Sequence, residues 1–264
     1  MGVKSTGSDE TYGWLSGAPQ MCEWLGERHI KGVMTARYTL ENRKFESTIR
    51  VRREDIEDDR LGVYGPQINM MAHAAASHPD ELVFEVLKKN FTAECYDGQP
   101  FFDADHPVVL DGETESSVSN FGGGTGTPWF LLDVSRAVKP LVFQTRIPYQ
   151  MQRVDKDSDS AVFFSDVYTY GVRARVNAGF GLWQFAYGSK QPLTPENYAL
   201  ARVAMQGMRY DGGRIMGVVP NLLVVPPEHE AAARALLTAD YIADGVTNVW
   251  RSSAELLVSP YLQE

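Results

Sequence analysis

The stretch PQINMMAHAAASHPDELVFEVLKKNF, residues 66–91, decides the fold. Apolar or small side chains recur along it with the three-four spacing of one helix face, at positions 68, 71, 72, 75, 76, 82, 83, 86, 87 and 91. This phase continues across Pro79. The sequence therefore allows one long helix kinked at Pro79, or a second helix that begins there with Ser77 or His78 as its cap. A single helix would span roughly 40 Å, and we expect it to act as a strut.

Before the strut, the periodicity changes from helical to alternating. Apolar side chains alternate with polar ones over residues 34–40 and again over 44–52, on either side of Glu41-Asn42-Arg43. This pattern predicts a long β-hairpin over residues 29–53 with a polar tip. An isolated hairpin is marginal in water, so it needs a partner surface in its own domain or on a neighbouring subunit.

The hairpin is flanked by segments of different character. Residues 1–13 are polar and rich in Gly, Ser and Thr, so we expect a mobile end, followed by a short helix near 20–27. Arg50 and Arg52 share one strand face, which is consistent with a solvated face or an intersubunit strip of ion pairs. The acidic residues between 54 and 59 spread around a helical turn without a nearby histidine, which favours an acidic contact or solvated face over a metal site.

Candidate chemistry after the strut is sparse. Asp103, Asp105 and His106 could bind a divalent ion or hold a catalytic base, but Asp and His before a proline are also common in loops. Residues 111–127 are glycine-rich without a following Lys-Ser/Thr, which predicts a flexible surface loop and no phosphate-binding loop. No motif of a hydrolase, metalloprotease or nucleotide-binding enzyme is present, so we predict no catalytic residues, no cofactor and no metal site.

The second half of the chain is predicted to be packed α+β structure. Short strands are expected at 129–133 and 140–144, and the aromatic-rich segment 162–186, which includes Phe163 and Phe164, is interpreted as core. From residue 192 a smaller α/β unit begins. It contains a helix capped by Thr194, a buried strand at 222–225, an Ala-rich helix at 228–237 and a last strand at 256–258.

Length and composition bound the class of protein. The 264 residues are 44% hydrophobic and 22% charged, which fits a folded protein of one large or two ordinary domains. The net charge of −9 argues against non-specific binding of nucleic acid. Apolar runs are too short to cross a membrane. Cys22 and Cys95 lie far apart in the sequence, which predicts two buried thiols in a reducing compartment.

The sequence resembles the major head subunits of Mu-like tailed phages. Matching segments are spread over most of the chain, and they include YGWL from residue 12, EDD from 57, LGVY from 61, PDEL from 79, CYDGQ from 95, FFD from 101, SRAVKPL from 135, AGFG from 178 and VVP from 224. The resemblance implies the Hong Kong-type capsid fold. It assigns residues 1–28 to an N-terminal segment with a shortened or processed arm, and 29–53 to the extended loop. Residues 54–192 would form a peripheral domain whose spine helix is 66–91, and 193–264 an axial domain.

The same resemblance implies the function and the partners. Copies of the chain would assemble as hexamers and pentamers of an icosahedral head that encloses double-stranded DNA without reading its sequence. The shell would be assembled in the cytoplasm of a bacterial host, with help from scaffold, protease, portal and decoration proteins, and would not contact a membrane. We expect intersubunit contacts at Arg37, Tyr38, Glu41, Asn42, Arg43, Lys44, Arg50, Arg52, Glu54, Asp58, Asp59, Asp240, Asp244 and Trp250.

Two alternative functions remain open at this point. An encapsulin-like compartment would share the fold but enclose a cargo enzyme, so protein cargo instead of nucleic acid would identify it. A hydrolase or metal enzyme would instead use Asp103, Asp105 and His106.

Overall fold

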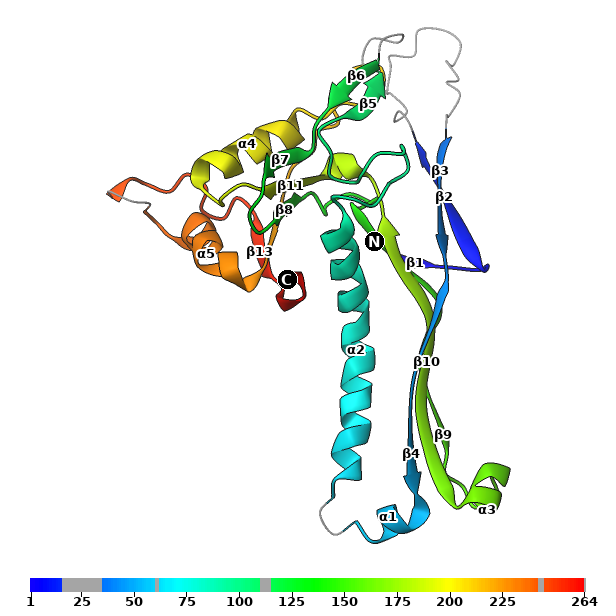
Figure 1. Cartoon of the computed structure of the whole chain (residues 1–264). Helices are drawn as coiled ribbons and strands as arrows, with labels where there is room; N and C mark the ends of the chain where they lie inside the picture. The colour runs from blue at the N-terminus through cyan, green and yellow to red at the C-terminus, as the bar shows by residue number, and fades with distance from the viewer. Residues whose placement is uncertain (16–34, 60–61, 110–114, 242–244, 264) are drawn as a thin grey trace, which may run out of the picture.

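A computed structural model describes residues 1–15, 35–59, 62–109, 115–241 and 245–263 (Figure 1). The strands are β1 (Gly2–Lys4), β2 (Asp9–Leu15), β3 (Thr35–Glu41), β4 (Arg43–Arg52), β5 (His106–Val109), β6 (Glu115–Val118), β7 (Phe121–Gly124), β8 (Trp129–Leu132), β9 (Leu141–Val154), β10 (Val167–Phe180), β11 (Ala186–Lys190), β12 (Leu222–Val225) and β13 (Glu255–Val258). The α-helices are α1 (Arg53–Glu57), α2 (Tyr64–Lys89), α3 (Ser160–Ser165), α4 (Pro195–Gln206) and α5 (Glu230–Thr238). The mixed content confirms the predicted α+β class.

Helix α2 is the predicted strut, and it runs through Pro79 as one continuous helix (Figure 1). The Asp59 carboxylate accepts the backbone N–H groups of Val63 and Tyr64, which satisfies donors that a helix start leaves free. Met71, Leu82 and Leu87 are the buried side chains of this helix. Of the two sequence interpretations, the single long helix is therefore the correct one, because the apolar face packs on both sides of the proline.

A four-stranded sheet lies beside α2 and forms a long arm with it (Figure 1). Its strand order is β1-β9-β10-β4, and β9 and β10 are 14 residues each. Leu82 of the helix packs with Ala174, Val176 and Ala178 of β10 in a small core of its own. Alternate residues of β10 therefore face α2, and the intervening residues lie on the opposite face, which we call the outer face.

The predicted pairing of the hairpin at residues 29–53 is wrong. β3 pairs with β2 in an antiparallel two-stranded ribbon, whereas β4 leaves that ribbon and pairs with β10. The change of partner occurs at Asn42, whose side-chain amide donates to Ser5 Oγ (2.7 Å) and to the Gly7 carbonyl (3.1 Å). Alternation predicts that a segment is a strand, but it does not determine which strand lies next to it.

The N-terminal residues are also ordered, contrary to the mobile end expected for 1–13. β1 pairs in parallel with β9, and the Met1 ammonium group donates to the Leu141 carbonyl oxygen at 2.6 Å. Ladder hydrogen bonds explain the order, because they do not depend on the polar character of the side chains. The helix expected near 20–27 and Cys22 lie outside the described residues.

The second body is a lobe built on a five-stranded sheet of order β13-β12-β8-β11-β7. Trp129, Phe130 and Leu131 of the central strand are fully buried, and α4 and α5 contribute Tyr198 and Leu236 to the same core. The strands, helices and Thr194 cap predicted for 192–264 are present, with the Thr194 side chain accepting the Asn197 N–H. The predicted boundary at 192/193, however, falls within this sheet and core, because β7, β8 and β11 precede it and β12 and β13 follow.

The described part of the glycine-rich segment, residues 115–127, contains strands β6 and β7 and is not the expected flexible loop. Gly122 and Gly124 belong to β7, at the edge of the lobe sheet. A Cβ atom on Gly124 would lie 2.4 Å from the Lys190 carbonyl carbon and oxygen. The glycines therefore allow two backbones to approach closely, a role that composition alone does not distinguish from flexibility.

The aromatic-rich segment 162–186 divides between the core and the surface. Phe180, Trp183 and Phe185 are buried as expected, but Phe163 and Phe164 on α3 are 77% and 82% exposed. Their interpretation as core is wrong because α3 is a short helix at the far end of the arm, where little else packs against it (Figure 1). Among the described residues, no helix is both long and apolar enough to cross a membrane.

Candidate functional site

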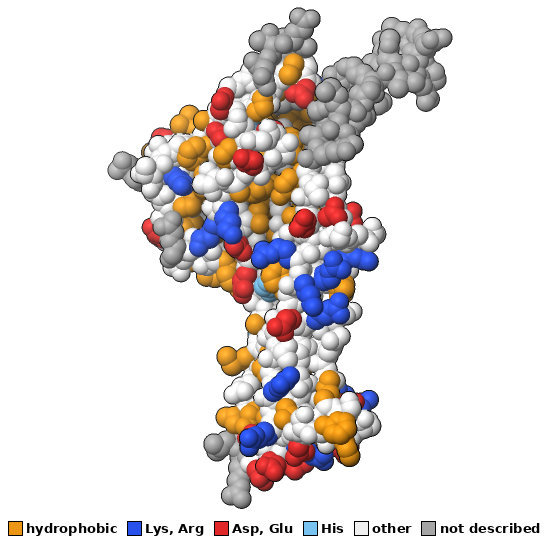
Figure 2. All heavy atoms as spheres, turned by 45° about the vertical axis from the view of Figure 1, so that its right-hand side comes forward, with side chains coloured by type: hydrophobic (Ala, Val, Ile, Leu, Met, Phe, Trp, Pro, Cys, Tyr) orange, Lys and Arg blue, Asp and Glu red, His pale blue; other side chains and the backbone are white. Residues whose placement is uncertain are grey.

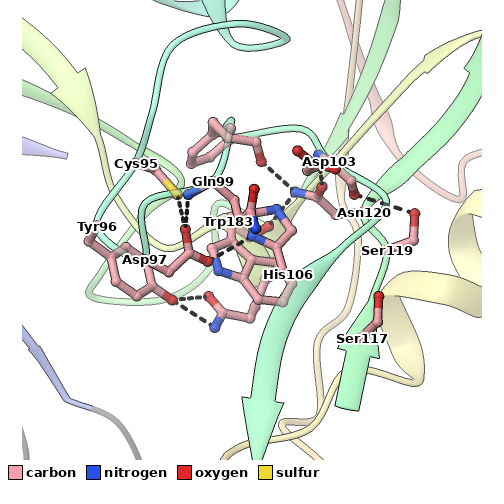
Figure 3. Close-up of polar contacts among 12 residues, drawn as sticks. Cys95, Tyr96, Asp97, Gln99, Asp103, His106, Ser117, Ser119, Asn120 and Trp183 are labelled. Atoms are coloured by element: carbon pink, nitrogen blue, oxygen red, sulfur yellow. Dashed lines mark hydrogen bonds and ion pairs between the residues drawn. The ribbon is translucent and has the colours of Figure 1, made fainter. Parts of the chain in front are cut away.

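The polar cluster that joins the two bodies begins in the loop between α2 and β5. The loop closes on itself through the Cys95 N–H, which donates to the Gln99 carbonyl oxygen at 2.8 Å. Gly98 takes a positive φ of 84°, a conformation that favours glycine, and it completes this turn. The turn directs the Asp97 side chain toward His106, which lies at the start of β5 (Figure 3).

Asp97 accepts three hydrogen bonds within this turn and across it. Its Oδ1 accepts the Cys95 thiol at 3.0 Å and the Gln99 N–H at 3.1 Å, and its Oδ2 lies 2.7 Å from His106 Nδ1. Burial by itself would raise the pKa of Asp97, but the hydrogen bonds from His106 and Cys95 lower it below its ordinary value. The ionised carboxylate therefore fastens the turn to β5.

His106 is fully buried, and its imidazole stacks on the Trp183 indole with ring centroids 3.9 Å apart. Its Nε2 atom has no hydrogen-bond partner among the described residues. Asn120 extends the cluster, because its side chain accepts the Asp103 N–H and donates to the carbonyl oxygens of Phe101 and Trp183 (Figure 3). The cluster thus connects the end of α2 to the lobe.

The structure separates the three residues considered for enzymatic chemistry. His106 points inward to Asp97, whereas Asp103 accepts the N–H of Ala104, and Asp105 is exposed. The donor atoms of Cys95, Asp97 and His106 lie within 4.8 Å of one another, which is the spacing of potential metal ligands. Burial raises the pKa of the Cys95 thiol, and the thiol already donates to Asp97, so hydrogen bonding fits this set better than ligation by a thiolate.

The contact residues predicted on the ribbon divide into anchors and exposed groups. Tyr38 packs on Phe180, and its hydroxyl accepts the Phe180 N–H. Besides its bonds to Ser5 and Gly7, Asn42 accepts a hydrogen bond from the Gln144 side chain. Burial raises the pKa of Tyr38. Glu41 and Arg43 are exposed, and Arg37 lies on β3 opposite Gly13.

Most residues predicted on the far arm are exposed. Lys44, Arg50 and Arg52 lie along the outer edge strand β4, and Glu54 and Asp58 lie on or next to α1. Asp59 differs from them because it is half-buried and caps α2.

In the lobe, the predicted contact residues also divide. The Asp240 carboxylate pairs with Arg251, and both side chains are exposed. Trp250 packs edge-on against Tyr198 within the lobe. Asp244 lies outside the described residues.

Sequence reasoning missed two exposed apolar surfaces. Phe163 and Phe164 form an edge-to-face pair on α3, with centroids 5.2 Å apart. Leu200 and Val203 of α4 are 63% and 69% exposed. The available signal was an adjacent pair of phenylalanines shortly after the acidic run 155–159 and directly before Ser165-Asp166, because so short and polar a setting leaves little room for a buried face.

Comparison with known proteins identifies strong relatives over the whole length. The family model of the Mu-like prophage major head subunit gpT matches residues 1–262. The chain is 41% identical to the Mu-like prophage FluMu major head subunit of Haemophilus influenzae, over 98% of this chain and 88% of that protein. It is 40% identical to the major capsid protein of Escherichia phage Mu, over 99% and 89% of the two chains.

Solved structures agree with this relationship. The procapsid protein of bacteriophage JBD30 matches with a TM-score of 0.84 and 42% identity, over 99% of this chain and 89% of that chain. The JBD30 capsid matches with a TM-score of 0.82 and 32% identity, over 99% and 88%. These matches confirm the Hong Kong-type capsid fold.

Proposed function

Because the chain belongs to the Mu-like prophage major head subunit family and is a major capsid protein, we propose that its copies assemble into an icosahedral head around double-stranded DNA. Hexamers and pentamers would be its capsomers, and the ribbon, the far end of the arm and the lobe would carry the contacts. The observation that carries this proposal is the shape of the subunit, in which these three parts project in different directions (Figure 1).

The ribbon supports an intersubunit role. β2 and β3 form a two-stranded sheet, and such a pair is marginal in water without a further surface. Its base is held by Tyr38 and by the Tyr12 hydroxyl, which donates to Gln144 Oε1 at 2.7 Å. A firmly anchored base suits an extended loop that lies on a neighbouring copy. We propose Arg37, Glu41 and Arg43 as its contacts.

We propose corresponding contacts for the other two projections. The far end of the arm would use Lys44, Arg50, Arg52, Glu54 and Asp58, with Asp59 supporting the local backbone. The lobe would act as the axial domain, and it would use Asp240 and Asp244 near the capsomer centre, where Trp250 supports the fold. Weak contacts of this kind become strong when a closed shell repeats them many times.

Other partners follow from the same role. We propose that scaffold, protease and portal proteins act during assembly in the bacterial cytoplasm, and that a decoration protein can bind the finished shell. One JBD30 capsid is described as decorated with minor capsid protein trimers. The family is one of structural proteins, and we propose that this subunit has no catalytic activity, which the complete burial of His106 supports.

The test is assembly of the full chain expressed with the other head proteins of its phage. Light scattering and electron microscopy should reveal closed shells of megadalton mass. Replacing residues 14–36 by a short Gly-Ser loop, which shortens the ribbon beyond Tyr38, should abolish or weaken shells while leaving the subunit folded. Persistent small species from the unaltered chain would contradict the proposed shell, and normal shells from the shortened chain would contradict the role of the ribbon.

A further inference from the structure

Four basic side chains from three strands gather on the outer face of the arm sheet. Lys44 of β4 lies directly opposite Arg175 of β10. Arg173, two residues before Arg175, lies on the same face. Arg146 lies in β9 at the bulge beside Ile147, which is the residue opposite Arg175, and its guanidinium donates to the Ser5 carbonyl oxygen at 3.5 Å. We call these four residues the basic cluster; Figure 2 shows Lys and Arg side chains gathered on the upper part of the arm, next to the lobe.

The basic cluster carries more positive charge than the carboxylates beside it balance. Directly opposed like charges such as Lys44 and Arg175 destabilise a sheet. In the part of the chain that the structure describes, no carboxylate lies within ion-pair distance of Lys44, Arg173 or Arg175. Glu46, which lies opposite Arg173, is the one acid in the ladder here, so the local charge is 4 − 1 = +3 on a chain of net −9. This arrangement favours an anionic partner.

A matching acidic surface lies at the far end of the same arm. Glu54, Asp55 and Asp58 on and beside α1 are exposed, and they form no ion pair among the described residues. By contrast, Glu57 is paired with Arg53 at 2.9 Å. We call the three unpaired acids the acidic tip; Figure 2 shows Asp and Glu side chains gathered at this end. Its three carboxylates complement the basic cluster, with Arg52 and Arg53 next to them in the chain.

The acidic tip cannot reach the basic cluster of its own chain. Arg173 lies opposite Glu46, and the strand β4 continues for six more residues to Arg52 before α1 begins. At about 3.3 Å per residue, that separation is about 20 Å. A contact between the two surfaces must therefore join two copies, and it is heterologous because the two copies contribute different surfaces.

We propose that the acidic tip of one subunit binds the basic cluster of a neighbouring subunit in the assembled head. The inference rests on the proposed assembly function and names a pair of surfaces for it. The exposed Phe163 and Phe164 lie at the same end of the arm, and an aromatic face can add a cation–π contact with an arginine to the ion pairs that the carboxylates form (Figure 1). A nucleic-acid phosphate backbone fits less well, because Glu46 lies within the cluster and the net charge of the chain is negative.

The decisive experiment exchanges the charges. The variant R173E/R175E and the variant E54R/D55R/D58R should each reduce the yield of shells at least about tenfold, since every repeated contact is affected. Combining all five substitutions should restore most of that yield. The lobe variant R209E/R214E is the control. Adding E54R/D55R/D58R to it should not improve the yield of shells. Thermal unfolding of the unassembled variants should stay close to that of the unaltered chain. Arg173 and the three acids are exposed and Arg175 is half-buried, and the new Glu opposite Lys44 offsets the new Glu opposite Glu46.

A cysteine pair provides an independent readout. R173C together with D55C should give covalently linked chains in oxidised shells, seen as a ladder on non-reducing gels. Within one chain the separation is too large for a disulfide. R173C with E255C, which places the second cysteine on the lobe sheet, should give no ladder.

The outcomes separate this contact from the broader function. Restored shells and a ladder from the R173C/D55C pair would support the contact. Normal shells from R173E/R175E with reduced retention of DNA would overturn the contact in favour of nucleic acid. Shells from the unaltered chain with no recovery on charge exchange would overturn the contact as well. Failure of the unaltered chain to form shells with its partner proteins would refute the assembly function, and this contact with it.

Discussion

The imidazole of His106 lies against the indole of Trp183, with ring centroids 3.9 Å apart and ring planes 9° apart. His106 begins β5 and Trp183 follows β10, so this contact connects the loop after α2 to the segment that follows a central strand of the arm sheet. Asp97 holds the other side of the imidazole through Nδ1. The cluster therefore joins the arm to the lobe.

Replacing Asp97 with Asn should destabilise the subunit without changing its shape. The substitution removes a charged acceptor from three hydrogen bonds, and loss of such buried bonds costs about 2–3 kcal/mol. Urea unfolding of the unassembled chain measures this loss. Asp105→Asn is the matched control, because Asp105 is exposed, and its free energy of unfolding should stay within about 0.5 kcal/mol. Equal effects of both substitutions would contradict the role of Asp97.

The contribution of Asp97 should depend on pH in a defined direction. Its pKa in the folded chain lies below the unfolded value of about 3.9, so the folded state favours the ionised form. The stabilisation is complete above that unfolded value and is lost as pH falls through the folded pKa. The difference in unfolding free energy between the unaltered chain and Asp97→Asn should therefore be constant near neutral pH and shrink below about pH 4. A difference that grew on acidification would show the wrong sign.

Replacing Pro79 with Ala should stabilise the subunit. Pro79 lies inside α2, where proline lacks the N–H that would bond to the preceding turn, and an interior proline costs about 3 kcal/mol relative to alanine. We expect the free energy of unfolding to rise by about 1–3 kcal/mol. Pro66 lies in the first turn of the same helix, where the missing N–H costs little, so Pro66→Ala should change stability by less than about 0.5 kcal/mol. A loss of stability in Pro79→Ala would mean that the ring itself packs favourably.

Replacing Gly124 with Ala should disrupt the edge of the lobe sheet. Gly124 has a φ of +93°, and a Cβ would meet the Lys190 backbone at 2.4 Å. Strain and overlap together should cost at least about 2 kcal/mol. Gly65 lies in α2 with open space around its Cα, so Gly65→Ala should instead stabilise by about 0.5–1 kcal/mol. The unfolding temperatures of the two variants should change in opposite directions. An unchanged unfolding temperature for Gly124→Ala would instead support a flexible loop at this segment.

Replacing Phe163 and Phe164 with Ala should separate folding from assembly. Both rings are exposed, so the free energy of unfolding of the subunit should change by less than about 0.5 kcal/mol. Shell yield should fall because an exposed aromatic pair is suited to a contact between copies. Phe101→Ala is the contrasting variant, since Phe101 is fully buried and its loss should cost about 3–5 kcal/mol. Unchanged shell yield would exclude the pair from the contacts.

Local pattern was sufficient for the strut, for the strands on either side of Asn42 and for the family. The stripe from Ile68 to Phe91 predicted α2, the alternation around Asn42 predicted β3 and β4, and the segments shared with Mu-like head subunits implied the fold that the structural matches confirm. These features depend on neighbours in the sequence, whose spacing is set by the 3.6-residue and two-residue periods of helix and strand.

Tertiary structure decided the partners of those elements. The sequence alone could not reveal that β3 would pair with β2 and β4 with β10, that Gly124 would pack against Lys190, or that Phe163 would be exposed. Lys44, Arg146 and Arg175 likewise come from three strands, and only the register of the sheet brings them to one surface. Strand partners and shared surfaces arise from contacts between distant segments, and periodicity carries no information about which distant segment will supply them.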